Sequence, residues 1–124
     1  MQTNAANEEL VREFCTAFSR RDVDELLGYF ADDAVYHNIP LAPAQGKDAI
    51  RATLETYVPG SPEIEFVTHH LASAGDVVFT ERTDKMTFGG KQVTLPVAGV
   101  FEIQDGKIKA WRDYFDLQQF MNPS

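Results

Sequence analysis

The chain contains one cysteine, Cys15, among 124 residues, so an internal disulfide bond is excluded. It also lacks a run of roughly 18–20 consecutive apolar residues, the length that a membrane-spanning helix needs. Residues 1–9 have neither the basic start nor the apolar run of a signal peptide. These features predict a cytoplasmic protein. Cys15 falls between apolar neighbours on an expected helix, which predicts a buried, inert thiol.

Basic residues are scarce. Eleven Lys and Arg face 19 Asp and Glu, which gives a formal net charge of −8. Such a surface repels phosphate backbones, and no cluster of Lys and Arg offsets the repulsion. The charge therefore argues against nucleic acid, anionic membranes and strongly anionic substrates as partners. A neutral small molecule fits this composition better.

The first half of the chain has helical periodicity. Its length suits one domain, residues 1–124. Apolar residues recur at helical spacing from Ala5 to Ser19. Asp22 is expected to cap a short second helix with Leu26, Leu27 and Phe30 on its apolar side, ended by Asp32 and Asp33. Another helix is predicted over Lys47–Val58, with Ile50, Leu54 and Tyr57 on one face.

The second half of the chain has the pattern of long strands. Four are expected there, over Ile64–Ala72, Val77–Phe88, Gln92–Gln104 and Lys107–Leu117. A short strand is also expected in the first half, over Ala34–Ile39. Gly89-Gly90 and Asp105-Gly106 are typical of hairpin turns. Helices followed by an antiparallel meander predict an α+β fold, in which the helices pack on one face of a curved sheet and enclose a pocket.

Three charged residues fall on strand faces that are otherwise apolar. Arg82 and Asp84 alternate in phase with Met86, and Asp113 alternates in phase with Trp111. An unpaired carboxylate in such a place costs several kcal/mol, roughly, so a partner is required. The guanidinium of Arg82 has five donors and can bridge both carboxylates.

An Asp–Arg–Asp cluster of this kind suits acid–base chemistry. Two acids around one arginine should split their titration, so that one stays ionised and the other is readily protonated. Tyr36 and Asn38 share a face of the first strand and could hold a water molecule beside a carboxylate. The pattern alone leaves a second interpretation open, in which the three charges form a structural ion-pair network.

The histidines do not indicate a metal site. His69 and His70 are adjacent on a strand and are expected to point to opposite faces, with no acidic or Cys ligand spacing around them. His37 is expected to be a strand or edge residue. We therefore expect no metal ligands in this chain.

Three motifs together resemble the limonene-1,2-epoxide hydrolase family. They are Arg82-Thr83-Asp84, Trp111-Arg112-Asp113-Tyr114-Phe115-Asp116 and Tyr36-His37-Asn38-Ile39-Pro40-Leu41. That family is part of a superfamily with a cone-shaped fold, shared with nuclear transport factor 2, ketosteroid isomerases and SnoaL-like cyclases. The resemblance covers essentially the whole chain and implies the fold expected above, with a mixed, mostly antiparallel sheet around an apolar pocket.

The resemblance also implies a role for each polar residue. Asp113 would be the general base that takes a proton from water, and Tyr36 and Asn38 would help it to hold that water. Asp84 would be the general acid that protonates the epoxide oxygen. Arg82 would bridge Asp84 and Asp113 and orient both. The reaction would take one step and would need no metal or organic cofactor.

The implied substrate is a neutral, largely apolar epoxide, which reacts with water to give a vicinal diol. The candidate apolar lining of the pocket comprises Phe18, Met86, Leu95, Val97, Trp111, Phe115 and Phe120. Relatives by this resemblance are dimers, so a symmetric homodimer is expected.

Two other functions stay open at this stage. The same fold supports ketosteroid-type isomerisation and polyketide cyclisation. An isomerase would need a carboxylate near Tyr36 and Asn38 and an acid near Ala98-Gly99, and the sequence has neither. A cyclase would also use an aspartate in the pocket. A non-catalytic binding module would need the pocket but not the buried charges.

Overall fold

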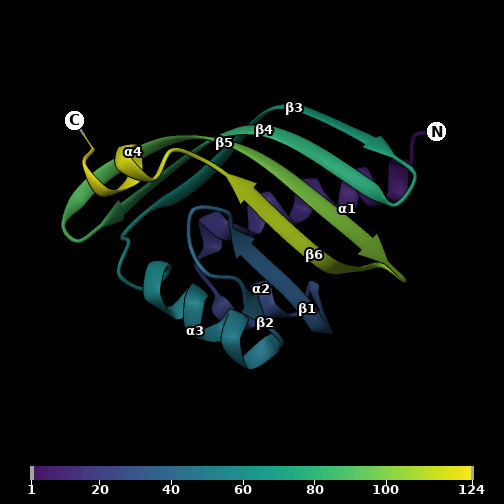
Figure 1. Cartoon of the computed structure of the whole chain (residues 1–124), viewed down its shortest axis with the longest axis horizontal. Coiled ribbons are helices and arrows are strands. Elements are labelled where there is room, and N and C mark those ends of the chain that lie inside the picture. The colour runs from purple at the N-terminus through teal and green to yellow at the C-terminus, as the bar shows by residue number, and fades with distance from the viewer. Residues whose placement is uncertain (1, 124) are drawn as a thin grey trace.

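Residues 2–123 are described by a computed structural model (Figure 1), and the two ends of the predicted domain, Met1 and Ser124, lie outside the described residues. The helical elements are α1 (Ala5–Ala17), a 3₁₀ turn (Phe18–Arg20), α2 (Val23–Leu27), α3 (Lys47–Tyr57) and α4 (Leu117–Met121). The strands are β1 (Phe30–Asn38), β2 (Ala44–Gln45), β3 (Ile64–Ala74), β4 (Val77–Phe88), β5 (Lys91–Gln104) and β6 (Lys107–Tyr114).

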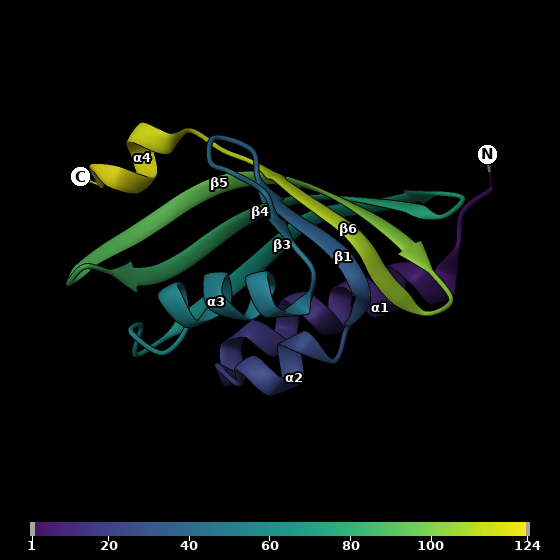
Figure 2. The same cartoon turned by 60° about the horizontal axis from the view of Figure 1, so that its bottom comes forward.

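The strands form one curved sheet in the order β2-β1-β6-β5-β4-β3. β1 and β6 are parallel, and the other neighbouring pairs are antiparallel. The helices α1, α2 and α3 gather on the concave side of the sheet, as Figure 2 shows. Helices on one face of a mixed, mostly antiparallel sheet are the predicted architecture, and the hairpin turns at 89–90 and 105–106 have the positive φ angles that such turns require.

The start of β1 differs from the prediction. The second helix ends at Leu27, and Phe30, predicted on that helix, is the first residue of the strand and pairs with Ile108 of β6. Phe30 is buried in the core, which draws it into the sheet. The pairing is irregular between Phe30 and Val35, so the exposed Asp32 and Asp33 lie inside a strand instead of breaking a helix. The short strand β2 is not among the strands expected from the sequence.

The C-terminal end differs as well. The last strand, predicted to reach Leu117, ends at Tyr114. The side chain of Asp116 then accepts a hydrogen bond from the backbone N–H of Gln118 at 2.9 Å, which caps the short helix α4. This helix has only five residues, too few for a helical period to be recognised in the sequence. Its effect is to place Phe120 against β5.

A cluster of aromatic rings joins the helices to the sheet. Phe14 of α1 makes edge-to-face contacts with Phe18, Phe101 and Trp111, with a centroid distance of 5.0 Å to Trp111. Trp111 is itself stacked between Tyr36, at 4.2 Å, and Phe101, at 5.4 Å. Such packing holds the indole of Trp111 in one orientation.

The remaining predictions about single residues had different outcomes. Cys15 is buried as predicted, and burial raises the pKa of its thiol to about 12. The expectation that His69 and His70 point to opposite faces is wrong, because the pairing of β3 with β4 is irregular between Thr68 and His70, and both histidines are exposed. No helix among residues 2–123 is both long and apolar enough to cross a membrane.

Candidate active site

Four neighbouring strands place four residues in one row across the sheet. Asn38 of β1 pairs with Asp113 of β6, Asp113 pairs with Gly99 of β5, and Gly99 pairs with Thr80 of β4. The backbone N–H of Ile39 donates to the carbonyl oxygen of Asp113 at 2.9 Å and fixes the end of β1 on β6. The row therefore depends on the parallel pairing of two strands that are far apart in the sequence.

The guanidinium of Arg82 lies against Gly99 of this row, and all five of its N–H donors are used. Its Nε donates to Oδ1 of Asp84 at 3.0 Å, and its Nη2 donates to Oδ2 of Asp84 at 2.8 Å and to Oδ2 of Asp113 at 2.7 Å. Its Nη1 donates to Oδ1 of Asp113 at 3.2 Å and to Oγ1 of Thr80 at 3.1 Å. One guanidinium thus holds both carboxylates in fixed positions.

The cluster is charged and almost completely buried. Arg82 is 1% exposed, and Asp84 and Asp113 are each 3% exposed. Burial acts to lower the pKa of Arg82, but the two carboxylates outweigh it and raise that pKa well above its usual range. The guanidinium also lies 5.0 Å from the centre of the Phe66 ring. Arg82 therefore remains a cation, and the cluster carries one negative charge when both acids are ionised.

The two acids have different surroundings. Asp113 accepts a further hydrogen bond from the indole Nε1 of Trp111 at 2.6 Å, which stabilises its negative charge. Among residues 2–123, Asp84 accepts side-chain hydrogen bonds from Arg82 alone. Burial raises the pKa of Asp84 to about 6, with Arg82 opposing the rise and Asp113 adding to it. Asp84 can thus be protonated near neutral pH beside a second carboxylate that has an additional hydrogen-bond donor, which is the arrangement that acid–base chemistry requires.

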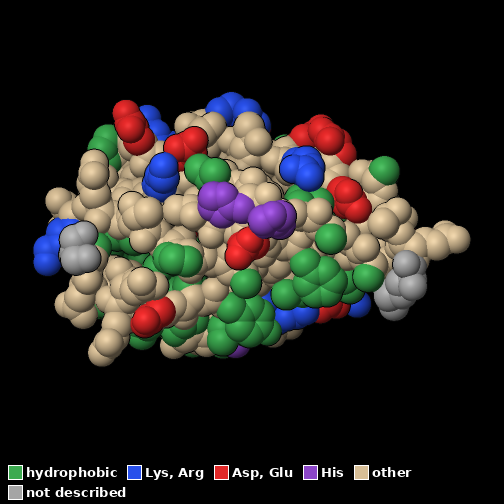
Figure 3. Space-filling model, turned by 90° about the horizontal axis from the view of Figure 1, so that it is seen from above, with side chains coloured by type: hydrophobic (Ala, Val, Ile, Leu, Met, Phe, Trp, Pro, Cys, Tyr) green, Lys and Arg blue, Asp and Glu red, His purple; other side chains and the backbone are tan. Residues whose placement is uncertain are grey.

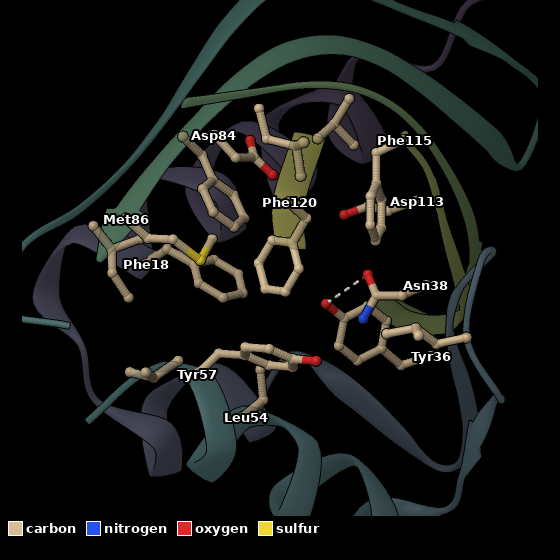
Figure 4. Close-up of a pocket in the computed structure, with 16 residues that line it drawn as sticks. Phe18, Tyr36, Asn38, Leu54, Tyr57, Asp84, Met86, Asp113, Phe115 and Phe120 are labelled. Atoms are coloured by element: carbon tan, nitrogen blue, oxygen red, sulfur yellow. Dashed lines mark hydrogen bonds between the residues drawn. The ribbon is translucent and has the colours of Figure 1, made fainter. Parts of the chain in front are cut away.

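Both acids face a pocket between the sheet and the helices (Figure 4). Tyr36 and Asn38 lie beside Asp113, and the Tyr36 hydroxyl donates to Oδ1 of Asn38 at 3.3 Å. Burial raises the pKa of Tyr36, so its phenol stays neutral. The rest of the wall is almost entirely apolar. A water molecule among Asp113, Tyr36 and Asn38 would face any apolar molecule in this pocket.

The structure brings the five polar residues predicted for the site into one place. Of the seven residues predicted to line the pocket, six do so, namely Phe18, Met86, Leu95, Val97, Phe115 and Phe120. Trp111 is not part of the lining. It is completely buried behind Asp113, where it serves as a hydrogen-bond donor to that carboxylate.

Sequence reasoning missed several residues of the site. Thr80 lies on the same face of β4 as Arg82, and the two-residue spacing could have identified it. Gly99 was recognised only as a position without an acid, although a lone glycine inside a strand often marks a close approach. The lining residues that were missed are Leu41, Leu54, Tyr57, Val58, Ile64 and Phe66.

The histidines and acids of the described residues do not form a metal site. Within residues 2–123, no three His, Cys, Asp or Glu side chains are grouped so that they could hold a metal ion. Nε2 of His37 lies 2.9 Å from the carbonyl oxygen of Leu41. On the outer face, His69 contacts Thr83 and His70 contacts Glu81.

Comparison with known proteins identifies the family. The model of the limonene-1,2-epoxide hydrolase catalytic domain matches residues 5–123. The chain belongs to the limonene-1,2-epoxide hydrolase family. Epoxide hydrolase EphG of Mycobacterium tuberculosis is 37% identical over 107 residues, which cover 86% of this chain and 71% of EphG.

Solved structures agree with this membership. A limonene-epoxide-hydrolase-like epoxide hydrolase of M. tuberculosis superposes with a TM-score of 0.81 at 33% identity, covering 94% of this chain and 86% of that one. An NTF2-like protein of Burkholderia pseudomallei superposes with a TM-score of 0.82 at 22% identity, covering 95% and 96%. The second similarity concerns the fold alone. This family member thus has the NTF2-like α+β fold.

The close packing at Gly99 leads to a prediction. A Cβ atom at this position would lie 2.5 Å from Nη1 of Arg82, 2.7 Å from Oγ1 of Thr80 and 2.9 Å from Oδ1 of Asp113. Gly99→Ala should therefore displace the guanidinium and lower the free energy of unfolding by about 1–3 kcal/mol, measured by urea denaturation. Gly60→Ala is the matched control, because its Cβ would meet nothing within 4 Å. Equal stability of the two variants would contradict the prediction.

Proposed function

We propose that this protein is a cofactor-independent epoxide hydrolase, which converts a neutral, largely apolar terpenoid or cyclic epoxide to a vicinal diol. The observation that carries the proposal is the geometry of Asp84 and Asp113, two carboxylates bridged by Arg82 and open to an apolar pocket. Membership of the limonene-1,2-epoxide hydrolase family and the similarity to EphG support it.

In the proposed reaction, Asp113 is the general base. Water held by Asp113, Tyr36 and Asn38 gives a proton to the Asp113 carboxylate as its oxygen attacks an epoxide carbon. Both oxygens of Asp113 already accept hydrogen bonds from Arg82, and Oδ1 accepts another from Trp111. These contacts hold the carboxylate as a base facing the water and oppose the reorientation that attack on carbon would need.

Asp84 is the general acid. As the carbon–oxygen bond of the ring breaks, Asp84 donates its proton to the leaving oxygen, which becomes the second hydroxyl of the diol. Release of ring strain drives the opening, so protonation and a positioned water are sufficient. Asp113 gains one proton and Asp84 loses one, and exchange of a proton between the two acids restores the site. Arg82 keeps both carboxylates in place throughout.

The pocket supports a neutral and largely apolar substrate. Its apolar walls come mainly from the 3₁₀ turn, β3, β4, β5, α3 and α4. The only cation of the site, among the residues described, is Arg82, and its five donors are all occupied by the protein. An anionic substrate would find no free partner and would meet the negative charge of the cluster.

The decisive variant is Asp113→Asn. Wild type incubated with a panel of cyclic epoxides in the presence of a chelator should form vicinal diols, which chiral chromatography quantifies. Asp113→Asn should lower the rate by about 10²–10⁴-fold, because the amide cannot take the proton from water. Asp33→Asn, the same change at an exposed position of β1, should behave like wild type. Ring-closed or isomerised products without diol would instead favour a cyclase or an isomerase.

The source of the new oxygen completes this test. Single-turnover reaction in ¹⁸O-water should label the diol in the first turnover, because water attacks the epoxide directly. An unlabelled first product would show that a carboxylate oxygen had been transferred through a covalent ester. Binding of the epoxide without any product would favour a binding module.

The raised pKa of Asp84 predicts the pH dependence. The general acid must be protonated, and burial keeps Asp84 protonated up to about pH 6 instead of its usual 3.8. As the pH rises through 6, kcat/KM should therefore fall, by about tenfold for each further pH unit. Circular dichroism over the same range serves as the control for unfolding. A rate that stays constant from pH 5 to pH 8 would contradict the role of Asp84.

We also propose that the protein forms a homodimer through the outer face of the sheet. Phe79 of β4 and Tyr114 of β6 are each 46% exposed there. On β5, which lies between them, Val100 pairs with Phe79 and Ala98 pairs with Tyr114. The apolar surface therefore extends across three strands. Figure 3 shows hydrophobic side chains gathered beside two neighbouring histidines on the face seen from above. A second copy of the same surface would cover them.

Light scattering at micromolar concentration tests this proposal. Wild type should have twice the mass of the chain, and Phe79→Arg should have the mass of one chain, because each interface would then bury two unpaired charges. Met121→Arg is the matched control, since Met121 is 58% exposed on α4, away from this face. A monomeric wild type would contradict the proposal.

A further inference from the structure

Tyr57 brings a polar group to the helical side of the pocket. The other four polar residues that line the pocket, Tyr36, Asn38, Asp84 and Asp113, all come from strands of the sheet. Tyr57 is the last residue of α3 and lines the same pocket, together with Leu54 one turn earlier. Figure 4 shows its ring across the pocket from Asp84, with its hydroxyl directed into the cavity on the side of Tyr36 and Asn38.

Aromatic neighbours hold the ring of Tyr57 in this orientation. Its centroid lies 5.2 Å from that of Phe88 and 5.8 Å from that of Phe120, and the second pair is edge-to-face. Phe88 and Phe120 also contact each other, at 5.1 Å. The hydroxyl is therefore carried on a packed ring and points into the pocket without the entropy cost of ordering a flexible side chain.

The hydroxyl of Tyr57 has no partner among the residues that line the pocket. The hydrogen bond drawn in Figure 4 joins Tyr36 to Asn38, and none reaches Tyr57. Burial alone raises the pKa of its phenol, so the group is neutral and its O–H can donate a hydrogen bond to an acceptor. A hydrocarbon packed against this hydroxyl would separate it from water and leave it unpaired, which costs about 1–3 kcal/mol.

We propose that the Tyr57 hydroxyl binds a second oxygen of the substrate, separate from the epoxide oxygen. This inference rests on the proposed function and narrows its substrate class to epoxides that also carry a hydroxyl, ether or carbonyl oxygen. The epoxide oxygen must lie at Asp84, on the opposite side of the pocket, so it cannot satisfy Tyr57 at the same time. The apolar frame of such a substrate contacts the walls, and its remote oxygen accepts a hydrogen bond from Tyr57.

The test compares two substrates of nearly equal shape, cyclohexene oxide and its ring-hydroxylated analogue. For wild type and Tyr57→Phe, kcat/KM is measured for both, and the ratio of hydroxylated to unsubstituted epoxide gives the selectivity. Tyr57→Phe keeps the ring contacts and removes only the hydroxyl, so the ratio should fall by about three- to tenfold, the range expected for one hydrogen bond. Thermal unfolding checks that the variant is folded.

Tyr29→Phe is the matched control, because it removes the same hydroxyl from a ring that packs against Phe14 and does not line the pocket. Its selectivity ratio should stay within about twofold of wild type. An unchanged ratio in Tyr57→Phe would overturn the inference while diol formation still supports the hydrolase. Equal losses on both substrates would overturn it too, since Tyr57 would then act on the reacting atoms. If wild type forms diol from neither epoxide, the proposed function fails and the inference fails with it.

Discussion

The contact between Arg82 and its two carboxylates is the constraint on which the rest of the site depends. Burying three charges is unfavourable unless every donor is used, and here the five N–H groups of the guanidinium all have acceptors. That requirement explains Thr80, which supplies the fifth acceptor, and Gly99, where a side chain would occupy the space of the guanidinium. The sheet is thus arranged around a charge cluster, and the missing side chain of Gly99 leaves the space that the guanidinium occupies.

The two acids that Arg82 holds differ in their other hydrogen bonds. Trp111 donates to Asp113 and not to Asp84, and its indole is placed for this by stacking between Tyr36 and Phe101. Residues that pack the core therefore give the two carboxylates different hydrogen-bond donors. Tyr36 belongs to the core and to the site, since its ring stacks on Trp111 and its hydroxyl faces the pocket with Asn38. Core and site are one continuous packing arrangement.

Alternation along single strands made much of this site predictable. Arg82 and Asp84 are two residues apart on β4, so their common inward side followed from the strand period alone. The features that alternation did not predict depend on contacts between distant segments. The parallel pairing that sets Asn38 opposite Asp113 joins β1 to β6, and no local pattern encodes it. The irregular pairing at His69 shifted side chains by one position relative to a regular strand, and the turn into α4 ended β6 at Tyr114 instead of Leu117.

The division of the pocket between sheet and helices explains how chemistry and substrate choice can vary separately. The proposed acid, base and bridging residues lie on β4 and β6, where a change at one position disturbs its paired neighbours. The opposite wall comes from α3, whose side chains Leu54 and Tyr57 face the cluster across the cavity. A substitution on that wall alters the shape and polarity offered to the substrate, while the hydrogen bonds of Arg82 stay intact. The single phenol on α3 is therefore a specificity feature set apart from the catalytic residues.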